Sequence, residues 1–133
     1  MSFLLDTNIL SAHLKRPSGL THRFVQHTGR LYASSLSLAE LYVWAFGRSM
    51  GDPLWLAIDD LLSTEVEVVE FDGACAHEYG RLRVDLKRRG VGIDNMDLLI
   101  AATAVARDAT LVTHNTAHFA GIPGLRLEDW LER

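Results

Sequence analysis

Short apolar runs alternate along the chain with longer segments of helical periodicity. The runs are brief and end in polar or turn residues, as buried strands do, and lie at residues 3–5, 31–33, 66–71, 111–112 and 125–127. The segments with helical character cover residues 8–16, 19–28, 38–46, 53–62, 72–89 and 95–107. This alternation predicts an α/β fold, a three-layer sandwich with a mainly parallel sheet.

Proline and glycine mark the ends of several predicted helices. Pro17 stops the first helix, whereas Pro53 suits the first position of a later one. Gly29 and Gly90 follow directly after helical segments, where glycine commonly ends a helix. No linker, internal repeat or low-complexity stretch interrupts the pattern, so we predict that residues 1–133 form a single domain.

Composition narrows the class of protein further. With 48% hydrophobic and 23% charged residues, the chain is typical of a globular protein, and no apolar stretch approaches the roughly 20 residues needed to span a bilayer. Its start lacks the pattern of a secretory signal, and Cys75 is the only cysteine, so we expect a reducing, cytoplasmic location. The net charge of −4 argues against binding nucleic acid through overall charge, but it allows a local basic patch.

Three acidic residues stand in places where each has both an ordinary and a functional explanation. Asp6 follows the first strand and either caps the next helix or binds a metal. Glu40 lies in an apolar helix, where it either faces solvent or belongs to a functional site. Asp97 begins a predicted helix, where a negative charge is favourable simply because it interacts with the helix dipole. A parallel sheet can nevertheless bring Asp6, Asp97 and the loop at Thr113 to one edge.

Several carboxylates at one edge would repel one another unless a cation held them. Sites built only from oxygen ligands select hard ions such as Mg²⁺ or Mn²⁺. Such ions commonly serve phosphate chemistry, because they polarise a phosphoryl oxygen and generate a nucleophile from water.

Four short motifs carry a resemblance to a known family. They are LDTN at residues 5–8, SLAEL at 37–41, DLLIAA at 97–102 and LVTHN at 111–115. Their order and spacing resemble those of PIN-domain ribonucleases and, more narrowly, the VapC toxins of toxin–antitoxin pairs. The closing residues 119–125 and 129–130 are also similar to that group, so the resemblance covers essentially the whole chain.

The resemblance implies a catalytic and metal-binding role for Asp6, Glu40 and Asp97. In PIN-domain ribonucleases the matching acids bind Mg²⁺ or Mn²⁺ and activate a water for attack on an RNA phosphodiester. The chain thus looks like a metal-dependent endoribonuclease, a hydrolase. VapC toxins tend to cut tRNA or rRNA within single-stranded loops, where bases are accessible.

Two positions depart from the family pattern. Asn115 stands where aspartate is common; its amide oxygen could orient a water but adds no charge. His118 replaces the usual acidic residue before Phe119, which puts a second metal in doubt. Asp94 could supply a carboxylate instead, although a cap or loop role is the simpler interpretation. His114 and His118 could chelate a transition metal only if they were helical, and the local pattern is a loop.

Basic residues near helix ends are candidates for contacts with RNA phosphates. They are Lys15 and Arg16, which close the first helix and are expected near the acidic residues, and Lys87, Arg88 and Arg89 at the end of the long fifth helix. Cations at these ends also suit the helix dipole, so a solvated end explains them equally well.

The resemblance further implies a cognate antitoxin protein of the VapB type. One helix carries more apolar area than a single buried face uses, in Leu41, Tyr42, Trp44, Ala45 and Phe46. An antitoxin segment could dock there, and a homodimer is expected because symmetric dimers are the commonest assemblies. The alternative function is a non-catalytic α/β module that uses the PIN scaffold only to bind protein. No membrane partner is expected.

Overall fold

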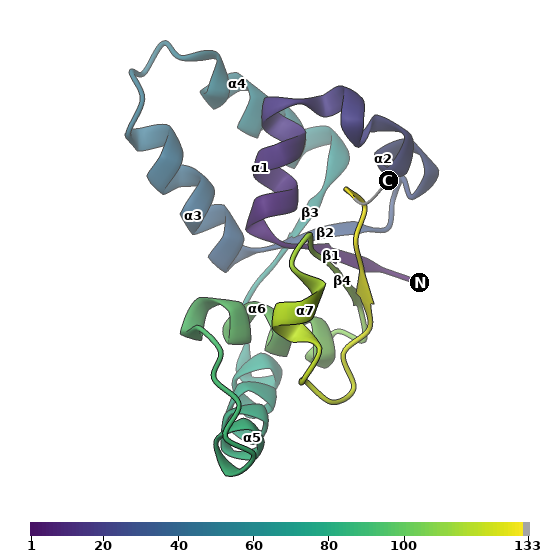
Figure 1. Cartoon of the computed structure of the whole chain (residues 1–133). Helices are drawn as coiled ribbons and strands as arrows, with labels where there is room; N and C mark the ends of the chain where they lie inside the picture. Colours follow the sequence, from purple (N-terminus) through teal and green to yellow (C-terminus); the bar gives the residue numbers. More distant parts are fainter. Residues whose placement is uncertain (132–133) are drawn as a thin grey trace.

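A five-stranded sheet with the strand order β3-β2-β1-β4-β5 lies between two layers of helices (Figure 1). This computed structural model describes residues 1–131, and each neighbouring pair of strands is parallel. The strands are β1 (Phe3–Leu5), β2 (Leu31–Ser34), β3 (Glu67–Val69), β4 (Thr110–Val112) and β5 (Leu127–Glu128). The prediction of a three-layer α/β sandwich with a mainly parallel sheet is confirmed.

Alternation along β1 builds a separate core on each face of the sheet. Phe3 and Leu5 point into one core, whereas Leu4 points into the other, because successive strand residues face opposite sides. The first core is covered by α1 (Thr7–Lys15), α2 (Thr21–Gln26), α3 (Ser35–Phe46) and α4 (Pro53–Asp60). The second is covered by α5 (Gly73–Arg88), α6 (Asn95–Ala106) and α7 (Thr116–Phe119).

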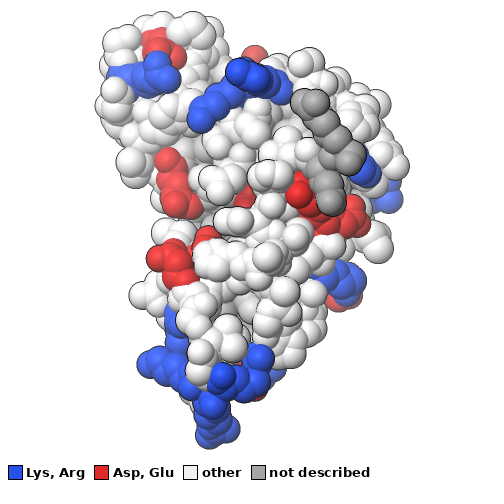
Figure 2. Space-filling view, viewed as in Figure 1, with Lys and Arg blue, Asp and Glu red and all other residues white. Residues whose placement is uncertain are grey.

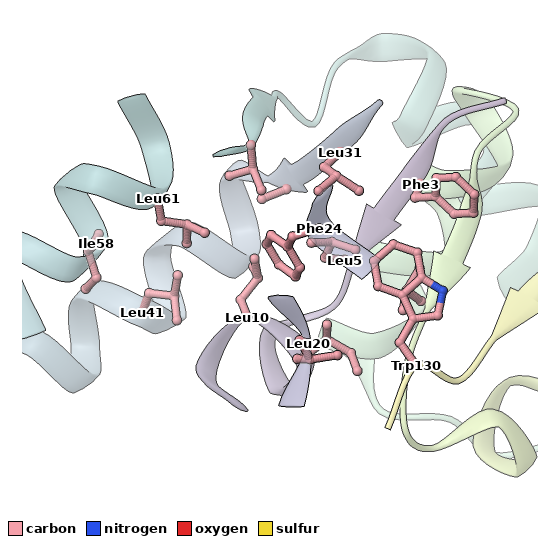
Figure 3. Packing of buried hydrophobic residues seen from close by; sticks show 14 of the residues in the cluster. Phe3, Leu5, Leu10, Leu20, Phe24, Leu31, Leu41, Ile58, Leu61 and Trp130 are labelled. Atoms are coloured by element: carbon pink, nitrogen blue, oxygen red, sulfur yellow. The ribbon is translucent and has the colours of Figure 1, made fainter. Parts of the chain in front are cut away.

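Figure 3 shows the first core, which contains the aromatic rings of Phe3, Phe24 and Trp130. The rings of Phe3 and Trp130 lie 5.3 Å apart between centroids, and both side chains are buried. Leu41 of α3 and Ile58 of α4 extend the same cluster outward. Burial of these side chains holds α3 against α1 and α4, and so fixes the position of the residues that α3 carries.

Several element ends differ from the sequence prediction. The helix expected over residues 19–28 is the shorter α2, and residue 19 instead ends a 3₁₀ turn, η1 (Pro17–Gly19), which begins at proline. The helix expected over 53–62 is α4 followed by a π-helical turn, η2 (Leu61–Glu65). The strand expected at 125–127 pairs only from Leu127, and the one at 66–71 is shortened. Among residues 1–131, no helix is long and apolar enough to cross a membrane.

Candidate active site

A cleft of about 140 Å³ opens at the carboxyl end of β1. It is lined by the first residues of α1, by α3 and by the start of α6, namely Asp6, Thr7, Asn8, Glu40, Asp97 and Ile100. Figure 2 shows acidic side chains on both sides of a notch in this face of the molecule. The three acids named from the sequence, which are 34 to 91 positions apart along the chain, therefore meet at one place.

Asp6 has both of the roles that the sequence left open, because it caps α1 and also lines the cleft. Its Oδ1 accepts a hydrogen bond from the Ile9 N–H at 2.9 Å, and the Thr113 hydroxyl also bonds to the carboxylate. The residue is only 7% exposed. Burial raises the pKa of Asp6 above its ordinary value, despite these two hydrogen bonds, and the nearby Asp97 raises it further.

Glu40 is tied to the same end of α1 from the opposite wall of the cleft. The Thr7 hydroxyl donates to its Oε1 at 2.5 Å, so neighbouring residues of the first motif serve both acids. Glu40 is half-buried, while Leu41 beside it is fully packed in the first core. The packing of α3 thus holds the glutamate at the cleft rather than on an open solvated face.

Asp97 lies in the first turn of α6, which Asp94 caps by accepting the Met96 N–H at 3.1 Å. Its Oδ2 is 3.2 Å from Nδ1 of His118, a residue of α7. Burial raises the pKa of Asp97; His118 opposes this, and the negative charges of Asp94 and Glu40 add to it. The carboxylate thus stands among like charges with one basic neighbour.

The remaining candidates lie elsewhere around this end of the sheet. Asn115 is exposed and outside the cleft lining; its backbone N–H donates to the Thr113 hydroxyl at 3.1 Å. His114 contacts Asp129 at 3.0 Å, whereas His118 contacts a different carboxylate, so the two histidines do not share a site. Asp94 has the cap role that the sequence favoured.

Sequence reasoning missed three polar side chains at the site, those of Thr7, Thr113 and His118. Thr7 and Thr113 belong to two of the four motifs, which was the available signal for them. The sequence marks His118 as a departure from the family pattern and as a chelator paired with His114, but not as a partner of Asp97; the expectation of a loop is wrong for His118, which lies in the short helix α7. Its contact with Asp97 depends on how α7 packs against the sheet, and local sequence does not show that.

The chemistry of the donors fits a hard divalent cation, although the side chains do not enclose one as they stand. Within residues 1–131, no three His, Cys, Asp or Glu side chains are close enough together to hold a metal ion. Each acid has another partner: Ile9 and Thr113 for Asp6, Thr7 for Glu40, and His118 for Asp97. Asp6 and Asp97 nevertheless have raised pKa values through burial and nearby negative charge, which is an environment that a cation would stabilise.

The basic residues that are candidates for RNA contacts form two groups, one at the end of α1 and one at the end of α5. Lys15 and Arg16 are exposed at the end of α1 away from Asp6, and the Lys15 ammonium lies 5.2 Å from the centre of the Trp44 ring. That position corrects the expectation that they adjoin the acids, because nine helical residues separate the two ends of α1.

The second basic group is at the end of α5, where Figure 2 shows a cluster of Lys and Arg beyond the acidic notch. Lys87 and Arg88 are exposed there, and Arg89 bonds to Asp85 and to the Gly121 carbonyl. The six residues 89–94 connect this end of α5 to the start of α6, which carries Asp97 of the cleft.

Comparison with known proteins agrees with this architecture. The family model for the PIN domain matches residues 3–125. The chain belongs to the PIN-domain family. A ribonuclease VapC2 of Rickettsia felis is 37% identical over 133 residues, and a tRNA(fMet)-specific endonuclease VapC of Salmonella typhimurium is 34% identical over 131; in both comparisons 98% of each chain is covered.

A solved structure shares the whole PIN-domain architecture. The crystal structure of VapBC2 from Rickettsia felis, bound to a DNA fragment from their promoter, contains a chain that superimposes with a TM-score of 0.89. That chain is 36% identical, and the match covers 98% of the present chain and 99% of the other. The chain is thus a PIN-domain protein whose relatives are named as VapC ribonucleases.

Proposed function

We propose that this chain is a metal-dependent endoribonuclease, the toxin of a VapBC-type toxin–antitoxin pair, and that its acidic cleft hydrolyses RNA phosphodiesters. The observation that carries the proposal is the meeting of Asp6, Glu40 and Asp97 in one cleft of a chain with full-length VapC relatives. Folding does not require carboxylates at all three places. A protein-binding module on the same scaffold would have no need of them.

The cleft residues would hold Mg²⁺ or Mn²⁺ through Asp6, Glu40 and Asp97. When bound, such a cation polarises a phosphoryl oxygen and makes water a better nucleophile. Asp6 is fixed by its two hydrogen bonds and Glu40 by Thr7, so these side chains supply ligands from packed elements. Asn115 and Asp94 are auxiliary candidates that could orient water or add charge at the rim.

The substrate of this cleft would be a single-stranded loop of a tRNA or rRNA, in keeping with the tRNA(fMet)-specific relative. Lys87 and Arg88 are exposed at the end of α5 that leads into α6, and they are the stronger candidates for phosphate contacts. Lys15, Arg16 and Arg89 are weaker candidates, since Lys15 stacks on Trp44 and Arg89 has partners of its own. A cytoplasmic location goes with such a substrate.

A VapB-like antitoxin would cover an apolar surface on α3 and α4. Val43, Phe46 and Leu56 are 76%, 70% and 71% exposed, and Trp55 packs edge-on against the Phe46 ring. Leu41 and Ala45, in contrast, are buried in the chain's own core. Exposed apolar area of this kind marks an interaction surface. A homodimer of the toxin chain belongs to the same proposal.

The enzymatic part is tested by incubating the purified chain with total tRNA and mapping the new RNA ends. We expect cleavage at a few loop positions with Mn²⁺ or Mg²⁺ and none with EDTA. Full cleavage in EDTA would contradict the metal-dependent mechanism.

The partner is tested by co-expressing the chain with the product of its adjacent reading frame. A stable complex that no longer cleaves RNA is expected. Substitution of Phe46 by Asp should weaken that complex, whereas Val84→Asp on α5, also at an exposed apolar residue, serves as the matched control. A complex that cuts RNA as fast as the free chain would contradict the toxin assignment.

A further inference from the structure

His118 is the one basic side chain that contacts an acid of the cleft among residues 1–131. Its Nδ1 lies 3.2 Å from Oδ2 of Asp97, and both side chains are partly exposed, at 39% and 33%. His114, which lies just before α7, is 64% exposed and contacts Asp129 instead. Of these two neighbouring histidines, only His118 therefore contacts an acid of the cleft.

The histidine is held from behind by the second core. Phe119, the next residue, is 2% exposed in that core, and its ring centroid is 5.7 Å from the His118 imidazole. The His118 backbone N–H also donates to the Asn115 carbonyl at 2.9 Å. The imidazole therefore projects from an anchored segment, whereas Asp97 can turn on its own side-chain bonds.

The surroundings of Asp97 would otherwise favour a turn away from the cleft. Glu40 and Asp94 both repel its carboxylate, and burial disfavours the charge. A third of the side chain is already in contact with solvent, so a rotation outward would relieve both effects. His118 is the neighbour that opposes this rotation.

We propose that His118 is a positioning residue for Asp97, holding one carboxylate oxygen at the wall of the cleft so that Asp97 stays in place when a divalent cation binds. This inference rests on the proposed function. Outer-shell partners of metal-ligating side chains typically account for about 10–100-fold in metal affinity. His118 would thus strengthen metal binding without touching the metal.

The test measures the binding of Mn²⁺ and of Mg²⁺ by isothermal titration calorimetry at one fixed pH. His118→Ala should weaken the binding of both ions about tenfold. His118→Asn should stay within about threefold of the native chain, because its amide nitrogen can occupy the place of Nδ1. His114→Ala, four residues earlier in the chain, is the matched control and should leave affinity unchanged. RNA cleavage by His118→Ala should recover when Mn²⁺ is raised.

Three results would overturn the inference. Native affinity in His118→Ala would show that the contact is incidental, and tighter binding would show that His118 competes with the metal for Asp97. A loss confined to Mn²⁺ would show that the ring itself is a ligand, because imidazole suits transition metals better than Mg²⁺. Under each of these results the proposed function stands if the native chain binds Mn²⁺ and Asp6→Asn does not. If the native chain binds no Mn²⁺, both the proposed function and the role of His118 are contradicted.

Discussion

Two helix-capping aspartates, one near each end of α6, have opposite electrostatic surroundings. Asp6, next to the amino end of α6, and Asp72, next to its carboxyl end, both cap helices by accepting the N–H of the residue three positions on. The twelve residues of α6 separate these regions by about 18 Å. At Asp72 the cap hydrogen bond from Cys75 and the nearby Arg107 lower the carboxyl pKa, whereas at Asp6 burial raises it.

The difference shows that a helix cap does not by itself tell a structural aspartate from a functional one. Asp72 is exposed and paired with a cation at 3.2 Å, so its charge is stabilised within the chain. Asp6 is buried beside other carboxylates, so its charge lacks a matching cation among residues 1–131. A functional metal site is therefore expected around an aspartate of the Asp6 kind, whose charge has no cation beside it in the described part of the chain, and not around one of the Asp72 kind.

The largest expected contrast between these two aspartates is in RNA cleavage. Asp6→Asn should reduce cleavage by more than about 100-fold, because loss of a ligand exceeds the usual effect of losing an outer partner. Asp72→Asn should cleave at the native rate. Comparison of initial rates on one tRNA substrate, with circular dichroism to verify folding, decides between them. Equal losses in both variants would mean that the assay reports stability rather than catalysis.

A second contrast concerns stabilisation by the metal. A ligand that binds only the folded chain adds about 2.7 kcal/mol at a concentration of 100 times its Kd. Mn²⁺ should therefore raise the melting temperature of the native chain and of Asp72→Asn equally, and raise that of Asp97→Asn much less. Thermal melts with Mn²⁺ and with EDTA provide the measurement. The same rise in all three proteins would place the metal outside the cleft.

A smaller contrast appears in EDTA as a dependence of stability on pH. The pKa of Asp6 is raised above 3.8, so its ionisation destabilises the fold as pH rises through that pKa. Asp6→Asn, which keeps the cap oxygen, should melt higher than the native chain at pH 7, and the gap should close as pH falls toward 3.8.

Asp72 should show the opposite sign. Its pKa is lowered, so its ionised form stabilises the fold at every pH above 3.8 and loses that effect only below. Asp72→Asn should thus melt slightly lower than the native chain, by the same amount from pH 7 to pH 5. A gap of the same sign for both aspartates would refute the assignment of their surroundings.

The smallest expected effect is that of Asn115→Asp. Asn115 is exposed and outside the cleft lining, so an added charge there is screened by solvent and salt. We expect the Kd for Mn²⁺, measured by calorimetry, to fall by less than about threefold. A tenfold fall would show that residue 115 enters the ligand sphere when the metal binds.

The sequence predicted the order of strands and helices along the chain well, because buried strands and helix caps leave local patterns. Asp72 and Pro53 mark their helix starts directly, and the structure has both. The ends of α2 and β5 were less predictable. Residues 17–19 form a separate 3₁₀ turn before α2, and the pairing of β5 depends on its neighbour β4 rather than on its own residues.

The candidate site was predictable only in part, for a related reason. Asp6, Glu40 and Asp97 lie in motifs that are contiguous in sequence, so the family resemblance names them, although their roles stay predictions. The contacts from Thr7, Thr113 and His118 join positions up to 107 residues apart. Such contacts are consequences of packing, which composition and periodicity do not encode.

The alternation along β1 also determines where the chain tolerates insertions and deletions. Leu4 and Leu5 fill opposite cores, and β1 is bonded on both sides, to β2 and to β4. A residue lost or gained within this strand would exchange the contents of the two cores and rotate Asp6 away from Glu40 at the same time. Length changes should therefore be accepted in the exposed turn between α3 and α4, and excluded from the three residues before Asp6.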